Sequence, residues 1–379
     1  MLKMRLDKLD SLYRIIADSY RLVAPQEKAG QVEFYPWSEG GQVRLDVLQT
    51  VKSAKEYFFP QSETLYHAKL TGKKLDIIPE EIEECPTVYF GVRGCDVRSF
   101  EILDKVFLSE PADTWYQAKR EQSVIVAAAC GNPENTCFCG LFGVDAALPG
   151  GDVTTWMDGS FLYWNPVTEK GDRLTEVVKE LFEGNADSTE AGTGTDKAAE
   201  AEKATDTEAE KTADAEQATE TAESVVTALI SQIHKKLDAL PLTGQLSLDG
   251  LDGDHLTELF ESDKWAELSK ACLGCGTCTF VCPTCQCYDI RDYDTGHGIQ
   301  KFRCWDSCMY SDFTMMAHGN NRTTQLQRFR QRFMHKLVYF PSNNDGEYGC
   351  VGCGRCLKKC PVSLNIAKVI KTLGGEKHE

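Results

Sequence analysis

The sequence lacks a long hydrophobic run, because no stretch of 18 or more apolar residues occurs among its 379 positions. We therefore expect no membrane-spanning helix. Residues 1–25 mix charged side chains with apolar ones at helical spacing, which predicts an amphipathic helix rather than a secretory signal. A chain with neither a span nor a signal is expected in the cytoplasm.

Motifs for nucleotide binding and hydrolysis are also missing. No GxGxxG follows a predicted strand, and neither GxxxxGK[ST] nor HExxH occurs. The seven histidines are scattered singly along the chain. We therefore predict that the chain has no site for hydride exchange and no Ser/His triad, so that catalysis takes place on other subunits.

Positive charge is scarce, and one segment carries much of the net charge of −17. Residues 184–224 contain 12 acidic residues, 3 lysines and no Val, Ile, Leu or aromatic residue. Such a composition buries too little apolar surface to offset its ordering entropy, so we predict a disordered acidic low-complexity insert. A short Ala/Glu-rich helix or an acidic docking tail are the alternatives. This acidity argues against nucleic acid as a partner.

Cysteine, in contrast, is abundant, with 17 residues. The number is odd, and a reducing cytoplasm keeps thiols free. The cysteines are therefore predicted to be metal ligands rather than disulfide partners.

The insert divides the chain into an N-terminal α/β domain (1–183) and a C-terminal region (225–379). Two apolar runs, Thr87–Val92 and Ser123–Ala129, predict buried strands, and the segment Val97–Phe107 predicts an amphipathic helix. Each strand ends in a loop that contains a cysteine. Ligands gather at the carboxyl ends of strands in open α/β sheets, so a site is expected there.

The pattern C-x2-C-x2-C-x3-C-P occurs twice, starting at Cys272 and at Cys350. It is typical of a pair of [4Fe–4S] clusters, in which the fourth cysteine of each motif binds the other cluster. The predicted ligand sets are Cys272, Cys275, Cys278 and Cys360 for one cluster, and Cys350, Cys353, Cys356 and Cys282 for the other. Zinc is the alternative, but its sites rarely use a third closely spaced cysteine followed by Cys-Pro.

Together these features predict a helical, ferredoxin-like dicluster domain with a large basic insertion at 283–349. The basic residues are Arg322, Arg328, Arg330, Arg332 and Lys336. They form either a solvated helix face, which we favour, or a collar that offsets the anionic clusters or docks a partner. The insertion also contains four cysteines, for which packing thiols are favoured over a further cluster: Cys285, Cys287, Cys304 and Cys308. Cys85 has no assigned role.

A weaker constellation lies in the N-terminal domain. Its four candidate ligands are Cys95, Cys130, Cys137 and Cys139. Three cysteines within ten residues of one loop are unusual for structural thiols in a reducing compartment. We predict a third [4Fe–4S] cluster here, with buried unliganded thiols as the alternative.

Several segments together carry a resemblance to a known family. They are Gly91–Asp96, Cys130–Cys139, Cys282–Cys285, Trp305–Cys308, Arg328–Lys336 and Cys350–Cys356. The chain resembles the four-iron dicluster electron-transfer family that includes the iron–sulfur subunit of anaerobic sulfite reductase and the beta subunit of soluble nickel–iron (sulf)hydrogenases. The resemblance spans about residues 85–370, apart from the acidic insert.

This resemblance implies an electron-transfer subunit of an anaerobic multisubunit oxidoreductase, placed between a flavin subunit that handles NAD(P)H and a catalytic subunit. One alternative is a reductase that acts on a disulfide or sulfur compound at its own cluster. However, the adjacent Cys-Cys pairs of heterodisulfide reductases are missing. The other alternative is an interaction module with structural clusters.

Overall fold

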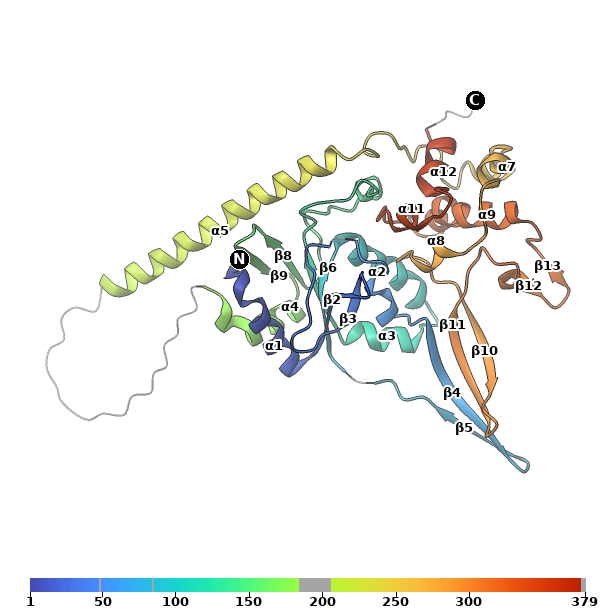
Figure 1. Cartoon of the computed structure of the whole chain (residues 1–379), viewed down its shortest axis with the longest axis horizontal. Helices are drawn as coiled ribbons and strands as arrows, with labels where there is room; N and C mark the ends of the chain where they lie inside the picture. The colour runs from blue at the N-terminus through green and yellow to red at the C-terminus, as the bar shows by residue number, and fades with distance from the viewer. Residues whose placement is uncertain (48, 84, 184–205, 376–379) are drawn as a thin grey trace.

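The computed structural model describes residues 1–47, 49–83, 85–183 and 206–375, with the backbone alone for 206–221. Figure 1 shows a large sheet with helices on both faces, a narrow four-stranded arm, and a group of short helices near the C-terminus. In the part of the chain that the structure describes, no helix is long and apolar enough to cross a membrane.

The large sheet has seven strands, and its four central strands are parallel. In sheet order the strands are β1 (Leu2–Arg5), β9 (Phe161–Pro166), β8 (Val153–Met157), β7 (Ser123–Ala128), β6 (Thr87–Val92), β2 (Arg21–Lys28) and β3 (Gln31–Pro36). The two strands predicted from the sequence form the fully buried centre, β6 and β7. Because β6 and β7 are parallel, their carboxyl ends, and the cysteines that follow them, lie at the same end of the sheet.

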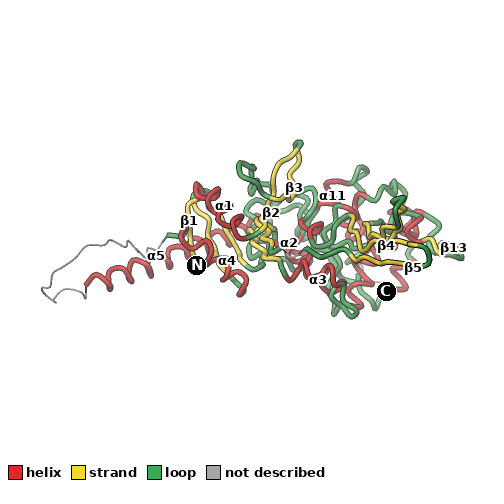
Figure 2. Tube along the Cα trace, turned by 90° about the horizontal axis from the view of Figure 1, so that it is seen from below, coloured by secondary structure: helices red, strands yellow, loops and turns green. Residues whose placement is uncertain are grey.

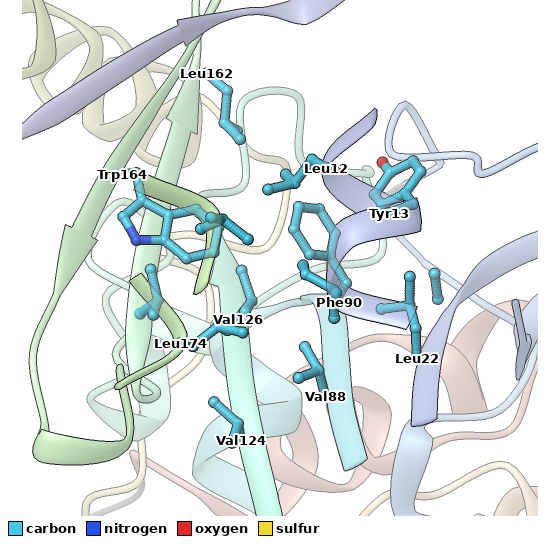
Figure 3. Close-up of a cluster of buried hydrophobic side chains, with 14 of the residues drawn as sticks. Leu12, Tyr13, Leu22, Val88, Phe90, Val124, Val126, Leu162, Trp164 and Leu174 are labelled. Carbon is cyan, nitrogen blue, oxygen red and sulfur yellow. The ribbon is translucent and has the colours of Figure 1, made fainter. Parts of the chain in front are cut away.

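Helices cover both faces of this sheet. On one face lie α1 (Leu9–Ser19) and α4 (Glu169–Val178), over a core that includes Phe90 and Trp164 (Figure 3). On the other face lie α2 (Gly94–Phe107) and α3 (Thr114–Glu121). Because successive side chains of a strand point to opposite faces, every residue of β6 is buried.

The single helix expected over residues 1–25 is wrong. Helix α1 covers the middle of that segment, but β1 precedes it and β2 follows it. The β1 strand pairs with β9, and β2 pairs in parallel with β6, so tertiary pairing determines the ends of this segment.

The acidic insert is described in part. Residues 184–205 lie outside the described residues, and 206–224 belong to the long helix α5 (Asp206–Asp238), in line with the Ala/Glu-rich helix given above as an alternative. This part is rich in Ala and Glu, which have high helix propensity. Helix α5 also contains the start of the region predicted to form the C-terminal domain, and its Val226 and Ile233 pack in one cluster with the N-terminal sheet.

The C-terminal helices share one hydrophobic core, with Trp265, Phe329 and Ile370 among its members. They are α6 (Leu256–Glu261), α7 (Lys264–Ser269), α8 (Thr277–Phe280), α9 (Gln325–Met334), a π-helix (His335–Tyr339), α10 (Phe340–Asn343), α11 (Arg355–Lys359) and α12 (Ile366–Leu373). The short helices α8 and α11, one inside each cysteine motif, pack against each other.

The arm is a second sheet, in which two distant hairpins pair. Its strand order is β10 (Tyr288–Asp294), β11 (Ile299–Trp305), β4 (Ser62–Thr71) and β5 (Lys74–Pro79), all antiparallel (Figures 1 and 2). One hairpin comes from the N-terminal part and the other from between the cysteine motifs. The two predicted domains therefore share a sheet.

Short elements complete the fold. A small hairpin is formed by β12 (Met315–Met316) and β13 (Gly319–Asn320). The 3-10 turns are Leu6–Lys8, Ala54–Tyr57, Cys139–Phe142, Lys179–Leu181 and Asp312–Thr314.

Candidate iron–sulfur sites

The first predicted ligand set lines one cavity, which we call site 1. Its thiols belong to Cys272, Cys275, Cys278 and Cys360. The first three lie in the loop before and within α8, and Cys360 follows α11. Because α8 packs against α11, Cys360 of the second motif lies beside the three cysteines of the first motif. In paired [4Fe–4S] sites of this type, the fourth ligand of each cluster comes from the other motif.

The second ligand set, site 2, also gathers around these two helices. Its members are Cys350, Cys353, Cys356 and Cys282. Burial raises the pKa of the Cys356 thiol well above its usual range, and the neighbouring Cys282, Cys353 and Cys350 thiolates raise it further. Four thiols that affect one another in this way lie close together.

Glycines make the second motif loop narrow enough to pack against the N-terminal domain. Gly352 and Gly354 have φ values of +59° and +75°, in the left-handed region. A Cβ atom on them would overlap the carbonyl oxygens of Phe138 and Thr136, respectively. The Phe138 amide donates to the Gly352 carbonyl at 2.9 Å. The loop of site 2 therefore lies directly on the N-terminal cysteine loop.

The four N-terminal cysteines line a further cavity, site 3: Cys95, Cys130, Cys137 and Cys139. Cys95 lies in the first turn of α2, after β6, and Cys130 follows β7. Cys353 of site 2 lines the same cavity, as do two arginines that are almost fully buried, Arg93 and Arg355. The carboxyl ends of the parallel strands thus lie beside the ferredoxin-like motifs.

The environment of these thiols favours their neutral form when no metal is bound. Burial raises the pKa of Cys137 and of Cys139 to about 12. It raises the pKa of Cys350 to about 12 as well, although Lys336 acts in the opposite direction. Iron binds thiolates, so filling sites 2 and 3 must release protons.

Hydrogen bonds point at the sulfur atoms of site 1. The Gln325 side-chain amide donates to Cys272 Sγ at 3.2 Å, and the Leu364 backbone amide donates to Cys360 Sγ at 3.2 Å. Hydrogen bonds to sulfur tune the reduction potential of a cluster. Sequence analysis did not identify Gln325, because the contact depends on how α9 packs over the motif loop.

The basic residues of the insertion differ from the solvated helix face that we favoured. Arg332 and Lys336 are buried, at 3% and 5% exposure. Burial lowers the pKa of Lys336, but the Cys282 and Cys285 thiolates more than offset this and hold it above its ordinary value. Of the two interpretations weighed above, these two cations fit the collar that offsets anionic clusters.

An ion pair that the sequence did not reveal joins sites 2 and 3. Arg355, inside the second motif, forms a bidentate pair with Asp96, next to Cys95, at 2.6 and 2.7 Å. Both side chains are at most 2% exposed. Arg355 also donates from Nε to the Thr50 carbonyl at 2.9 Å.

The thiols of sites 1 and 3 surround cavities rather than a single point. Among the described residues, no three His, Cys, Asp or Glu side chains form a group that could hold one metal ion. A cubane accepts thiolates that are spread out, because each binds a different iron atom. This arrangement fits [4Fe–4S] clusters better than zinc.

Five cysteines remain outside sites 1–3. Cys85 lies before β6, and Cys304 lies on β11; neither lines the cavities of sites 1 and 3. The other three, Cys285, Cys287 and Cys308, line a cavity of their own.

Replacing Asp96 by Asn is expected to leave the Arg355 charge buried without its partner. Breaking a buried pair in this way costs about 3–5 kcal/mol of the free energy of unfolding. Anaerobic chemical denaturation measures the loss. The double variant Asp96→Leu/Arg355→Met is the control, because it removes both charges and should recover part of the stability. An unchanged midpoint in Asp96→Asn would contradict the role of this pair.

Replacing Gln325 by Leu is expected to lower the reduction potential of one cluster. The N–H···S bond that is lost stabilises the more negative reduced state, and a difference of ~1 kcal/mol corresponds to about 40 mV for one electron. An EPR-monitored redox titration measures the shift. Gln331→Leu, on the same helix, is the matched control and should leave all potentials unchanged. Identical titrations of Gln325→Leu and wild type would exclude this tuning.

Comparison with known proteins agrees with the geometry. A family model described as a 4Fe–4S dicluster domain matches residues 271–364, which include both motifs. The sulfhydrogenase 2 subunit beta of Pyrococcus furiosus is 29% identical over 354 residues, covering 92% of this chain and 91% of that protein. No solved structure matches. The chain therefore carries a 4Fe–4S dicluster domain and is similar along most of its length to a sulfhydrogenase beta subunit, as its motifs indicated.

Proposed function

We propose that the chain is the electron-transfer iron–sulfur subunit of a cytoplasmic, anaerobic multisubunit oxidoreductase. It relays single electrons between a flavin subunit that uses NAD(P)H and a catalytic subunit, which is a hydrogenase, a sulfite reductase or a flavin-linked bifurcating enzyme. Two [4Fe–4S] clusters occupy sites 1 and 2, and a third occupies site 3.

The observation that carries this proposal is the continuous series of the three sites. Sites 1 and 2 exchange their fourth cysteines through α8 and α11, and Cys353 of site 2 lines the cavity of site 3. Neighbouring clusters of this kind pass electrons one at a time. A series that runs from the N-terminal sheet to the C-terminal helices has two ends, one for a donor and one for an acceptor.

The similarity to the sulfhydrogenase beta subunit supports the same conclusion. It covers 92% of the chain, so it includes the N-terminal domain with site 3 as well as the dicluster domain. That relative is named as one subunit of a larger enzyme. A relay protein of this kind needs partners on both sides and no hydride site of its own.

The residues around the sites provide positive charge and hydrogen bonds. They do not make or break covalent bonds. When bound, each cluster supplies one-electron redox chemistry. Arg332 and Lys336 offset negative charge from the side of α9, and Arg93 and Arg355 do so beside site 3. The Gln325 hydrogen bond biases site 1 toward reduction. Buried cations stabilise the reduced, more negative state of each cluster.

Site 3 is tested by replacing Cys137 with Ser. The variant should contain about four fewer iron atoms per chain than wild type, because one cubane is lost. Iron and acid-labile sulfide are measured on anaerobically purified protein. Cys304→Ser, outside the three ligand sets, is the control and should keep the wild-type content. Unchanged iron in Cys137→Ser would show that the N-terminal thiols carry no cluster.

The relay role is tested by purifying the tagged chain anaerobically from its native host. We expect two other subunits to copurify, one that contains flavin and one that is catalytic, and we expect the clusters to titrate within the physiological range of potentials. Redox-silent clusters would favour a structural module. A chain that is monomeric and turns over a disulfide or sulfur substrate alone would make it a reductase and overturn the proposal.

A further inference from the structure

The three cysteines left outside sites 1–3 lie together. Cys285, Cys287 and Cys308 line a cavity of about 20 Å³, equal to that of site 3 and close to the 30 Å³ of site 1. A disulfide would use two of the three thiols and leave the third without a function.

The arm hairpin brings these residues together. Its register pairs Tyr288 with Trp305, and the ladder continues beyond the strands, where the Asp306 amide donates to the Cys287 carbonyl at 3.0 Å. The next residue, Ser307, is fully buried and accepts a hydrogen bond from Thr279 of α8 at 2.9 Å. The hairpin hydrogen bond and the contact of Ser307 with α8 together therefore hold Cys308 beside Cys287.

Three buried cations surround the loop that carries the first two of these thiols. Arg332 and Lys336 line the cavity itself. Lys55 lies behind the loop, where it donates to the carbonyls of Cys282 and Cys285 at 3.0 and 2.9 Å. All three are at most 5% exposed.

The described hydrogen-bond partners of these cations are uncharged groups or thiols, rather than carboxylates. Lys336 donates to the Thr284 hydroxyl and to the Gly349 carbonyl. Arg332 has Nη1 3.6 Å from Cys285 Sγ, and its buried Nε has no acceptor among the described atoms. Burying several cations is unfavourable unless anions lie beside them, so a negatively charged occupant of this cavity would stabilise all three.

We propose that Cys285, Cys287 and Cys308 bind a further [4Fe–4S] cluster, with His335 as the fourth ligand (site 4). Each thiolate binds one iron atom, and His335 is the remaining Cys or His side chain on the cavity wall. The negative charge of the thiolate-bound cluster adds to that of the clusters proposed in sites 1 and 2, and Arg332 and Lys336 offset both. This reverses the interpretation of these cysteines as packing thiols.

Site 4 adjoins both ferredoxin-like sites. Cys285 lies three residues after Cys282, a predicted ligand of site 2, and Lys55 donates to the carbonyls of both. Arg332 joins it to site 1, because its other guanidinium nitrogen, Nη2, donates to the Cys278 carbonyl at 2.9 Å. A cluster here is a branch beside the main series, and it gives electrons a second route toward the arm.

Native mass spectrometry of the anaerobically purified chain counts the clusters directly. We expect four clusters in wild type, three in Cys308→Ala, and four in the control Cys304→Ser, whose cysteine lies in the same hairpin but outside the cavity. A Cys308→Ala variant that keeps the wild-type count overturns site 4.

The wild-type count also separates this inference from the proposed relay. Three clusters in wild type, with one lost in Cys137→Ser, would mean that site 3 exists and site 4 does not. Three clusters with none lost in Cys137→Ser would mean that site 3 fails and site 4 stands. Two or fewer would overturn site 4. This comparison holds even if Cys308→Ala does not fold.

The histidine ligand is tested by replacing His335 with Cys. This variant should keep four clusters and shift one EPR component to a lower potential, because a thiolate adds negative charge where a neutral imidazole was bound. His335→Gln, of similar size, should lose or perturb the same component. Titrations identical to wild type in both variants would exclude His335 as a ligand.

Discussion

The buried pair between Arg355 and Asp96 is the contact on which the arrangement of the sites depends. Arg355 lies within the second cysteine motif, and Asp96 lies in the first turn of α2, so the pair joins the two halves of the molecule. Arg355 Nη2 also donates to the Thr50 hydroxyl at 3.0 Å. The rigid guanidinium fork fixes both distance and orientation. Sites 2 and 3 are therefore held in one geometry, which electron transfer between them requires.

Local spacing allowed much of the site to be predicted. The two motifs place their ligands within a few residues, so Cys272, Cys275 and Cys278 could be grouped from the sequence alone. The strands β6 and β7 were also identified, since buried parallel strands are continuous apolar runs. In these segments, local sequence and tertiary structure favour the same conformation.

Long-range packing explains what the sequence did not reveal. The Cys285, Cys287 and Cys308 thiols meet because a hairpin returns the chain, and no local spacing indicates that. Arg332 and Lys336 were placed on a solvated face because their segment is polar, yet they point inward to the thiols. At the N-terminus, strands of few residues gave too little periodicity to distinguish from a helix. In these places contacts between distant segments of the chain determine the structure.

The shared arm sheet makes folding depend on the order of synthesis. Thr64 of β4 and Gln300 of β11 are hydrogen-bonded across 236 positions of sequence. At ~5–20 residues per second, the ribosome needs roughly ten to fifty seconds to make the second strand after the first. During that interval the β4 edge has no partner, and an unpaired edge is open to pairing with another chain. Lys73 lies in the β4–β5 turn and Lys74 begins β5. Their positive charges at the end of the hairpin disfavour pairing with another chain until β11 has been synthesised.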